Sequence, residues 1–433
     1  MSNQHSLSIT FLLLWMVICI STSVEAQFHN GLQIEYGKNR VQYREFNWQY
    51  HIQDSFEIYY YQGGKELAGA VAGIVEECNS ELKTFFGSDL EGPIQILVYN
   101  NLTEFRQSNI GVFNADDESE NIGGTAKIIG NKLFIYGSGD RKKLIRDLTE
   151  GLSRIALQQV LYRGSWQDAI KSGSTIHVPD WFTEGLVKYI SEPVSARSHA
   201  HIYDAARSGE LHKIDRTYGE EAGNLGIAVW SYINDVYGKQ SIANILYMVR
   251  ISRNVEGGIR FATGMTLNQI INEVVNYSLD QTPSDYSNSL PPIGDLKSKR
   301  KAIKKGVSFV ATKTSPDGKV QAYIKSDLGQ LQVYVADIES GDIQRKAVHG
   351  NKLHRTDDDR SMEIAWHPNS QQFSYVISEK GQPVLATIRI DEKKPVLKNL
   401  FRIDDVMGLD YSKDGRSIVF SGLNGGRSDL YIY

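Results

Sequence analysis

A five-residue turn motif recurs three times in the last third of the chain and constrains the fold more than any other feature. The copies begin at Ser315, His367 and Ser412 and read Ser-Pro-Asp-Gly-Lys, His-Pro-Asn-Ser-Gln and Ser-Lys-Asp-Gly-Arg. The Asp-Gly and Asn-Ser pairs favour tight hairpin turns, because these residues tolerate left-handed backbone angles. Each copy precedes two strand-like segments, at 320–324 and 331–335, 373–377 and 384–390, and 417–421 and 430–433. The repeat predicts consecutive small antiparallel sheets.

The order of turn, apolar strand and a strand ending in Asp429-Leu430-Tyr431 resembles the repeat of TolB-like, WD-type β-propellers. The resemblance covers residues 308–433 and implies an all-β, partial propeller of about two and a half blades. A propeller needs about four to eight blades to close. We therefore expect this sequence to be a fragment of a longer protein.

A second motif is the run at 179–189, Pro-Asp-Trp-Phe-Thr-Glu-Gly-Leu-Val-Lys-Tyr. It resembles the helix that supplies a glutamate zinc ligand in thermolysin-like (gluzincin, MA-clan) peptidases, and Glu184 matches that ligand. Those enzymes also need an upstream HExxH helix, whose two histidines bind the metal and whose glutamate activates water. The upstream helical pattern here, at 144–154, contains no histidine.

Two alignments of this helix with HExxH are open. In the first, Arg146 and Glu150 stand at the histidine positions and Asp147 at the glutamate position; in the second, Thr149 and Ser153 flank Glu150. Arginine does not give up its proton to bind a metal, and hydroxyl groups are poor neutral ligands. The resemblance thus implies a degenerate peptidase site with three vestigial positions and no metal or cofactor, namely Asp147, Glu150 and Glu184. We interpret Glu184 as a helix residue that is hydrogen-bonded inside the former cleft.

The other histidines of the chain are poorly placed to replace the missing zinc ligands. His199 and His201 place both rings on one face only if they lie on a strand, and the surrounding residues favour a helix or loop. His177 lies seven residues before Glu184, and His199 lies fifteen after it.

The order of predicted elements between these motifs is strand, helix, strand, strand, long helix, followed by a helical lobe. We expect strands at 56–61, 94–99 and 132–136, and helices at 67–86, 140–161, 181–190, 224–236, 240–250 and 267–275, with Thr266 as an N-cap. This order is the one that the zincin resemblance implies. Residues 27–280 are therefore predicted to form a degenerate α+β peptidase-like domain. The Pro-rich and basic residues 281–307 are predicted to form a linker.

Residues 1–26 have the pattern of a secretory signal peptide. The apolar stretch of about 12 residues is too short to span a bilayer comfortably, and Val24-Glu25-Ala26 is an acceptable cleavage site. An uncleaved anchor is the alternative. After cleavage only Cys78 remains, so the fold does not depend on an intrachain disulfide. No second stretch reaches spanning length, and we expect a periplasmic or otherwise extracytoplasmic protein without a membrane span.

The formal charge of −4 does not indicate nucleic acid as a partner. The combined motifs resemble large exported proteins of Bacteroidetes-type bacteria that join a peptidase-like domain to a TolB-like propeller. The leading interpretation is a non-catalytic scaffold that binds envelope proteins or polypeptide segments, or assists their translocation. Two alternatives remain open: a zinc metallopeptidase with non-standard ligands, using Glu150 or Asp147 as base and Glu184 as ligand, and a glycan- or peptidoglycan-binding propeller protein.

Overall fold

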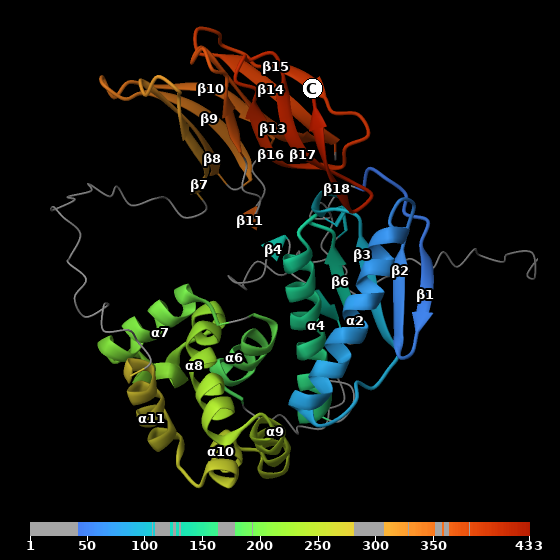
Figure 1. Cartoon of the computed structure of the whole chain (residues 1–433), viewed down its shortest axis with the longest axis vertical. Coiled ribbons are helices and arrows are strands. Elements are labelled where there is room, and N and C mark those ends of the chain that lie inside the picture. Colours follow the sequence, from blue (N-terminus) through green and yellow to red (C-terminus); the bar gives the residue numbers. More distant parts are fainter. Residues whose placement is uncertain are drawn as a thin grey trace, which may run out of the picture. The chain divides into compact units, whose positions relative to one another are not determined.

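The computed structural model describes residues 42–105, 107–108, 122–123, 127–129, 131–162, 178–192, 194–280, 307–327, 329–350, 357–358, 363–380 and 382–433. The predicted signal peptide and residues 281–306 of the predicted linker lie outside these ranges. Among the described residues, helices and a five-stranded mixed sheet make up most of the part before residue 281, and antiparallel sheets make up most of the part after residue 306 (Figure 1). Within the described ranges, no helix is both long and apolar enough to cross a membrane.

The mixed sheet has the strand order β1-β2-β3-β6-β5. The central strands β2, β3 and β6 run parallel, whereas β1 and β5 lie antiparallel at the two edges. The bounds are β1 Gln49–Gln53, β2 Phe56–Tyr60, β3 Ile94–Tyr99, β5 Lys127–Ile129 and β6 Lys132–Tyr136. The predicted strands at 56–61, 94–99 and 132–136 are confirmed. Apolar runs such as Ile94-Gln95-Ile96-Leu97-Val98 are buried on both faces, as is usual for parallel strands.

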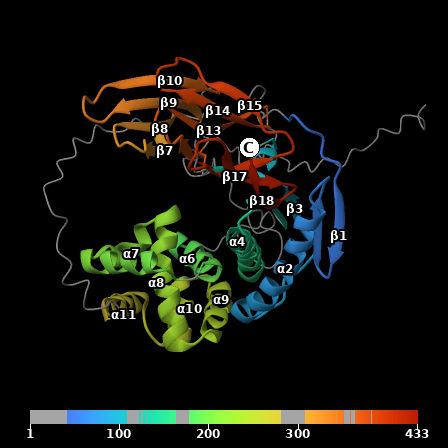
Figure 2. The same ribbon diagram turned by 45° about the horizontal axis from the view of Figure 1, so that its top comes forward.

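Two long helices pack on this sheet and against each other, α2 (Lys65–Phe86) on β2 and α4 (Arg141–Tyr162) on β6 (Figures 1 and 2). Asp140 caps α4, because its Oδ1 accepts a hydrogen bond from the Lys142 backbone N–H at 2.8 Å. Gly151 allows α4 to approach the sheet, since a Cβ at this position would stand 2.4 Å from Leu133 Cδ1. Both helices were predicted, and each begins or ends within two residues of the predicted limits.

The remaining helices form a second group with a largely apolar interior. Their bounds are α6 Asp180–Ser191, α7 Ala196–Ser208, η1 Glu210–Arg216, α8 Gly219–Tyr237, α9 Gln240–Ser252, α10 Val255–Thr263 and α11 Leu267–Asp280. The predicted N-cap of α11 is confirmed, because Thr266 Oγ1 accepts from the Gln269 N–H at 3.3 Å. Short elements elsewhere are α3 Leu102–Phe105, β4 Ile122–Gly123 and β11 Asp357–Asp358.

Helix α11 ends at Asp280, five residues past its predicted end, and η1 was not predicted. Two other helices also differ from the sequence pattern. Helix α8 begins at Gly219, five residues before the predicted start, because its first turn is exposed and polar and carries no apolar periodicity. Helix α10 was not predicted, because the pair Gly257-Gly258 is typical of a turn. Gly258 instead permits close packing on α9, since a Cβ there would stand 2.4 Å from Val249 Cγ2.

The C-terminal strands form three antiparallel sheets, as the repeat predicts. Sheet I has the order β10-β9-β8-β7, sheet II the order β12-β13-β14-β15 and sheet III the order β16-β17-β18; Figure 2 shows the consecutive strands of sheet I. The bounds are β7 Val307–Thr314, β8 Val320–Asp327, β9 Gln330–Asp337, β10 Ile343–His349, β12 Ile364–Trp366, β13 Gln372–Glu379, β14 Gln382–Arg389, β15 Val396–Asn399, β16 Asp405–Tyr411, β17 Ile418–Asn424 and β18 Arg427–Ile432. The blades of β-propellers are four-stranded antiparallel sheets, the arrangement that sheets I and II have here.

The first and third repeat turns share one side-chain hydrogen-bond pattern. In the first, Ser315 Oγ donates to Asp317 Oδ1 at 2.6 Å and accepts from the Val320 N–H at 3.0 Å. In the third, Ser412 Oγ bonds in the same way to Asp414 and to the Ser417 N–H. Gly318 and Gly415 have positive φ angles, which glycine adopts without strain, and Ser370 takes this conformation in the second turn.

The third turn predicts a pH dependence. The hydrogen bond from Ser412 Oγ, followed by that from the Arg416 backbone N–H, lowers the pKa of Asp414. A carboxyl group whose pKa falls on folding stabilises the fold above its unfolded-state pKa, and this contribution is lost as the pH falls through the folded-state pKa. We therefore expect Asp414→Asn to lower the urea unfolding midpoint at pH 7 and to change it much less at pH 2.5. An equal decrease of the urea midpoint at pH 7 and at pH 2.5 would contradict the assignment of this stabilisation to the Asp414 carboxylate.

Candidate functional site

The two helices that carry the peptidase-like motifs, α4 and α6, pack against each other. Glu150 and Arg154 lie one turn apart on α4, so both side chains point from the same face of that helix. Glu184 lies on α6, and its carboxylate meets them there. The structure therefore brings together two of the three vestigial positions, Glu150 and Glu184, through a residue that the sequence analysis did not select.

Arg154 forms the centre of this group. Its Nη1 and Nη2 donate to the two carboxylate oxygens of Glu184, each at 2.6 Å, which is a bidentate pair. Nη2 also donates to Oε1 of Glu150 at 3.0 Å. The side chains of Arg154 and Glu184 are each 32% exposed and that of Glu150 is 24% exposed. We call these three residues the Arg154 cluster.

The electrostatics of the cluster favour the charged guanidinium. Burial by itself would lower the pKa of Arg154, but the hydrogen bonds and negative charges of Glu184 and Glu150 outweigh it, and the pKa is raised. Arg154 therefore keeps its positive charge at every accessible pH. Both oxygens of Glu184 are engaged by this cation.

Asp147, the third vestigial position, contacts Lys143 and Arg146 rather than the Arg154 cluster. It is 5% exposed and accepts from Lys143 Nζ at 2.7 Å, and Arg146 Nε lies 3.7 Å from its other oxygen. Burial raises the pKa of Asp147, and the attraction by Lys143 opposes this rise. Arg146 Nε also lies 3.8 Å from Glu192 of the segment after α6, so it faces carboxylates on both sides.

The second alignment places two small polar side chains in the core. Thr149 Oγ1 donates to the Ile145 carbonyl at 2.8 Å and lies 3.1 Å from Cys78 Sγ of α2. Ser153 is fully buried, and its hydroxyl has no hydrogen-bond partner among the described residues. Both face the packed interior, whereas Glu150, which occurs in both alignments, meets Glu184 through Arg154.

The aromatic and glycine residues of the α6 motif explain how Glu184 is held. Trp181 and Phe182 are fully buried, and the Trp181 indole donates to Asp215 Oδ1 at 2.6 Å. Gly185 lies against Gly226 of α8: a Cβ on Gly185 would stand 2.5 Å from Gly226 Cα. The motif is thus accounted for by packing, which fixes the helix and leaves Glu184 on the side that faces α4.

Histidines do not join this cluster in the part of the chain that the structure describes. His199 and His201 lie on α7, two residues apart, so their rings leave different faces of the helix. His177 lies outside the described residues. Within those residues, no group of three or more His, Cys, Asp or Glu side chains is arranged to hold a metal ion.

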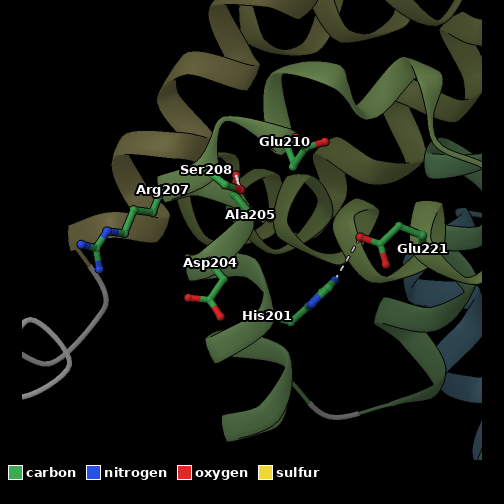
Figure 3. A pocket seen from close by; sticks show the side chains of 7 residues that line it. All are labelled: His201, Asp204, Ala205, Arg207, Ser208, Glu210 and Glu221. Carbon is green, nitrogen blue, oxygen red and sulfur yellow. Dashed lines mark hydrogen bonds and ion pairs between the residues drawn. The ribbon is translucent and has the colours of Figure 1, made fainter. Parts of the chain in front are cut away.

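A separate surface hollow of about 570 Å³ lies between α7, η1 and the start of α8. Figure 3 shows His201 directed toward Glu221, and the two side chains are 3.2 Å apart. The other residues of its lining are Asp204, Ala205, Arg207, Ser208 and Glu210. None of the Arg154 cluster lines this hollow.

No protein-family model matches the chain, and no curated protein matches it. Among solved structures it is similar to TolB from Acinetobacter baumannii, at 17% identity and a TM-score of 0.24 over 29% of each chain. A putative TolB from Agrobacterium tumefaciens matches at 22% identity and a TM-score of 0.22, over 28% of this chain and 40% of that one. The β-propeller domain of the Trilobed protease from Pyrococcus furiosus matches at 8% identity and a TM-score of 0.22, over 30% and 44%.

The chain thus spans less than half the length of each of these structures. The neighbours include propellers of the TolB type, as the repeat suggested. The peptidase-like assignment of residues 27–280 stays a prediction.

Proposed function

We propose that this protein is a non-catalytic, extracytoplasmic binding protein, in which a former peptidase cleft accommodates a polypeptide segment and the propeller-type sheets contact envelope proteins. The observation that carries the proposal is the bidentate pair of Arg154 with Glu184. A gluzincin needs this carboxylate free to bind the metal, together with two imidazoles. Here both its oxygens accept hydrogen bonds from a permanent cation.

Charge explains why metal and Arg154 exclude each other. A zinc ion bound by Glu184 would stand within a few ångströms of the guanidinium, and the two like charges would repel each other strongly at this partly buried position. The positive guanidinium also neutralises the carboxylate charges of Glu184 and Glu150, which a metal ion would otherwise neutralise. Arg154 therefore acts as a built-in replacement for the cation and holds α4 and α6 together without a ligand.

The backbone of the mixed sheet supports peptide binding. Among the described strands, β5 is the last of the sheet on the β6 side, and it lies antiparallel to β6. Such an edge offers backbone donors and acceptors to an extended polypeptide, which adds as a further strand. Binding of this kind needs neither a metal nor a nucleophile, so it survives the loss of catalysis.

A binding assay tests the proposal. A fluorescent pool of unfolded peptides is expected to bind the purified chain, as measured by anisotropy, and to remain uncleaved by mass spectrometry. Ile128→Pro removes a backbone donor from β5 and is expected to weaken binding at least about five-fold if β5 is the docking edge. Pro introduced at Asn399, on the outer strand of sheet II, is the control and is expected to leave peptide affinity unchanged.

Peptide cleavage that increases with time and disappears in Glu184→Gln contradicts the proposal and favours the zinc peptidase alternative. Unchanged peptide affinity in Ile128→Pro, with the fold intact by circular dichroism, excludes β5 as the docking edge.

A further inference from the structure

The face of the mixed sheet that lies opposite helices α2 and α4 carries a row of polar side chains. Side chains alternate along β2, so Ile58 enters the core beneath the helices and Glu57 leaves the other face. In the strand register, Glu57 stands opposite Gln95 of β3, and Gln95 stands opposite Lys132 of β6. All three side chains are half-buried. We call Glu57, Gln95 and Lys132 the polar row.

Exposed aromatic and aliphatic side chains border this row on strand β1. Ile52 stands opposite Glu57, and Tyr50 stands opposite Tyr59, so both project from the same face as the polar row. Tyr50 is 59% exposed and Ile52 is 60% exposed. The rings of Tyr50 and Tyr59 have their centres 5.4 Å apart and are tilted by 31°. The face therefore offers an aromatic surface directly beside hydrogen-bonding groups.

Hydrogen bonds inside the row orient the carboxylate and leave other polar atoms available. Glu57 Oε2 accepts from the Tyr59 hydroxyl and from Gln95 Nε2, each at 2.8 Å. Burial, followed by the hydrogen bond to Glu57, raises the pKa of Tyr59 to about 12, so its hydroxyl remains a donor. Among the described residues, Glu57 Oε1, Gln95 Oε1 and Lys132 Nζ form no hydrogen bond or ion pair. Acceptors and a charged donor are thus available to a ligand.

We propose that this face of the mixed sheet binds a neutral sugar ring that is part of an oligosaccharide chain. A pyranose ring has a face of C–H groups, which packs on an aromatic ring, and hydroxyl groups at its rim, which both donate and accept hydrogen bonds. Tyr50 and Ile52 match the first property. The polar row matches the second property, because it combines acceptors with a donor.

The charges of the polar row favour a neutral ligand over an ion. Glu57 and Lys132 carry opposite charges and lie two strands apart, which is about 10 Å at the usual strand spacing. A cationic ligand at Glu57 would be repelled by Lys132, and an anionic ligand at Lys132 would be repelled by Glu57. A sugar hydroxyl interacts with either group without bringing a charge. The strands from β1 to β6 span about 14 Å, which is wide enough for a short oligosaccharide.

The sugar site is separate from the peptide edge proposed above. A peptide adds to the open side of β5 through backbone hydrogen bonds, whereas the face of a sheet offers side chains only. Tyr50→Ala and Ile128→Pro therefore test the two proposals independently. The face is open to solvent rather than enclosed, so binding in the millimolar range is expected.

Saturation-transfer difference NMR of the purified chain tests the proposal, with cellohexaose, maltohexaose and chitohexaose as probes. At least one of these neutral oligosaccharides is expected to receive saturation. Tyr50→Ala removes the exposed ring and is expected to weaken its binding at least about five-fold. Lys132→Met keeps the stem, removes the donor and is expected to weaken binding about three-fold. Tyr247→Ala is the matched control, because Tyr247 is 52% exposed on α9, which packs on the helical side of the sheet.

A lack of saturation transfer to all three oligosaccharides at about 10 mM overturns the proposal, because millimolar binding would be detected at that concentration. Unchanged affinity in both Tyr50→Ala and Lys132→Met, with folding verified by circular dichroism, also overturns it. An equal loss of affinity in the Tyr247→Ala control places the sugar elsewhere and counts against it as well. A lysine-rich peptide that binds in place of the sugars, and is lost in Tyr50→Ala, assigns the face to a cationic partner instead.

Discussion

Replacing Arg154 by methionine is expected to lower the free energy of unfolding by about 2 kcal/mol. The substitution keeps the length and the apolar stem of the side chain and removes the guanidinium. Glu150 and Glu184 then face each other across the α4–α6 contact without a cation. Breaking a fully buried pair costs more than this, but all three side chains are partly exposed, and water screens part of the repulsion. Urea unfolding at pH 7 measures the loss.

Two further variants sharpen this test. Arg154→Lys keeps the charge and loses the bidentate geometry, so we expect an intermediate loss. The triple variant Arg154→Met, Glu150→Gln, Glu184→Gln removes the unpaired charges as well and is expected to recover part of the stability. A stability of Arg154→Met equal to that of the wild type would show that the cluster does not hold the helices together.

Replacing Gly226 by alanine is expected to have the largest effect of any substitution considered, about 3 kcal/mol or a complete loss of the folded state. A Cβ at this position would stand 2.2 Å from the Trp181 carbonyl oxygen and 2.7 Å from Gly185 Cα. Both neighbours are backbone atoms of α6, so no side-chain rotation relieves the contact. Helices α6 and α8 must separate, and the buried Trp181 and Phe182 then lose contacts.

Gly69 and Gly73 on α2 provide the matched controls. A Cβ at either position meets nothing within 4 Å, so alanine there is expected to stabilise the helix by up to about 1 kcal/mol. The variants are compared by the urea concentration at the midpoint of unfolding, provided that the slopes of the unfolding transitions are unchanged. A Gly226→Ala chain as stable as Gly69→Ala would contradict the close helix contact and, with it, the explanation given for the glycine of the α6 motif.

The repeated elements were predictable from the sequence because their signals are local. The turns at Ser315, His367 and Ser412 carry residues that suit left-handed backbone angles, and the apolar periodicity of α2 and α4 marks the faces that cover the sheet. The sheet order β1-β2-β3-β6-β5 depends on pairings between distant segments, which single-sequence patterns do not encode. Helix α10 was missed because its glycines suit a turn as well as a close helix contact.

The candidate site was predictable in part. The motif containing Glu184 directed attention to this position, and the interpretation of Glu184 as a hydrogen-bonded helix residue agrees with its contacts. Arg154 was not selected, because it lies outside both HExxH alignments, four residues past the first and one past the second, and pairs with a residue 30 positions away. The sequence signal for Arg154 was its spacing of four residues from Glu150. Such pairs of opposite charge are common on exposed helix faces, so the spacing does not by itself indicate a site.

Zinc titration of the purified chain after chelator treatment tests the central claim most directly. The account predicts that isothermal titration calorimetry finds no zinc binding that depends on Glu184, so that the wild type and Glu184→Gln give the same isotherm. Stoichiometric zinc binding that is lost in Glu184→Gln would show that the carboxylate leaves Arg154 for a metal, and would contradict the replacement of the catalytic cation by Arg154.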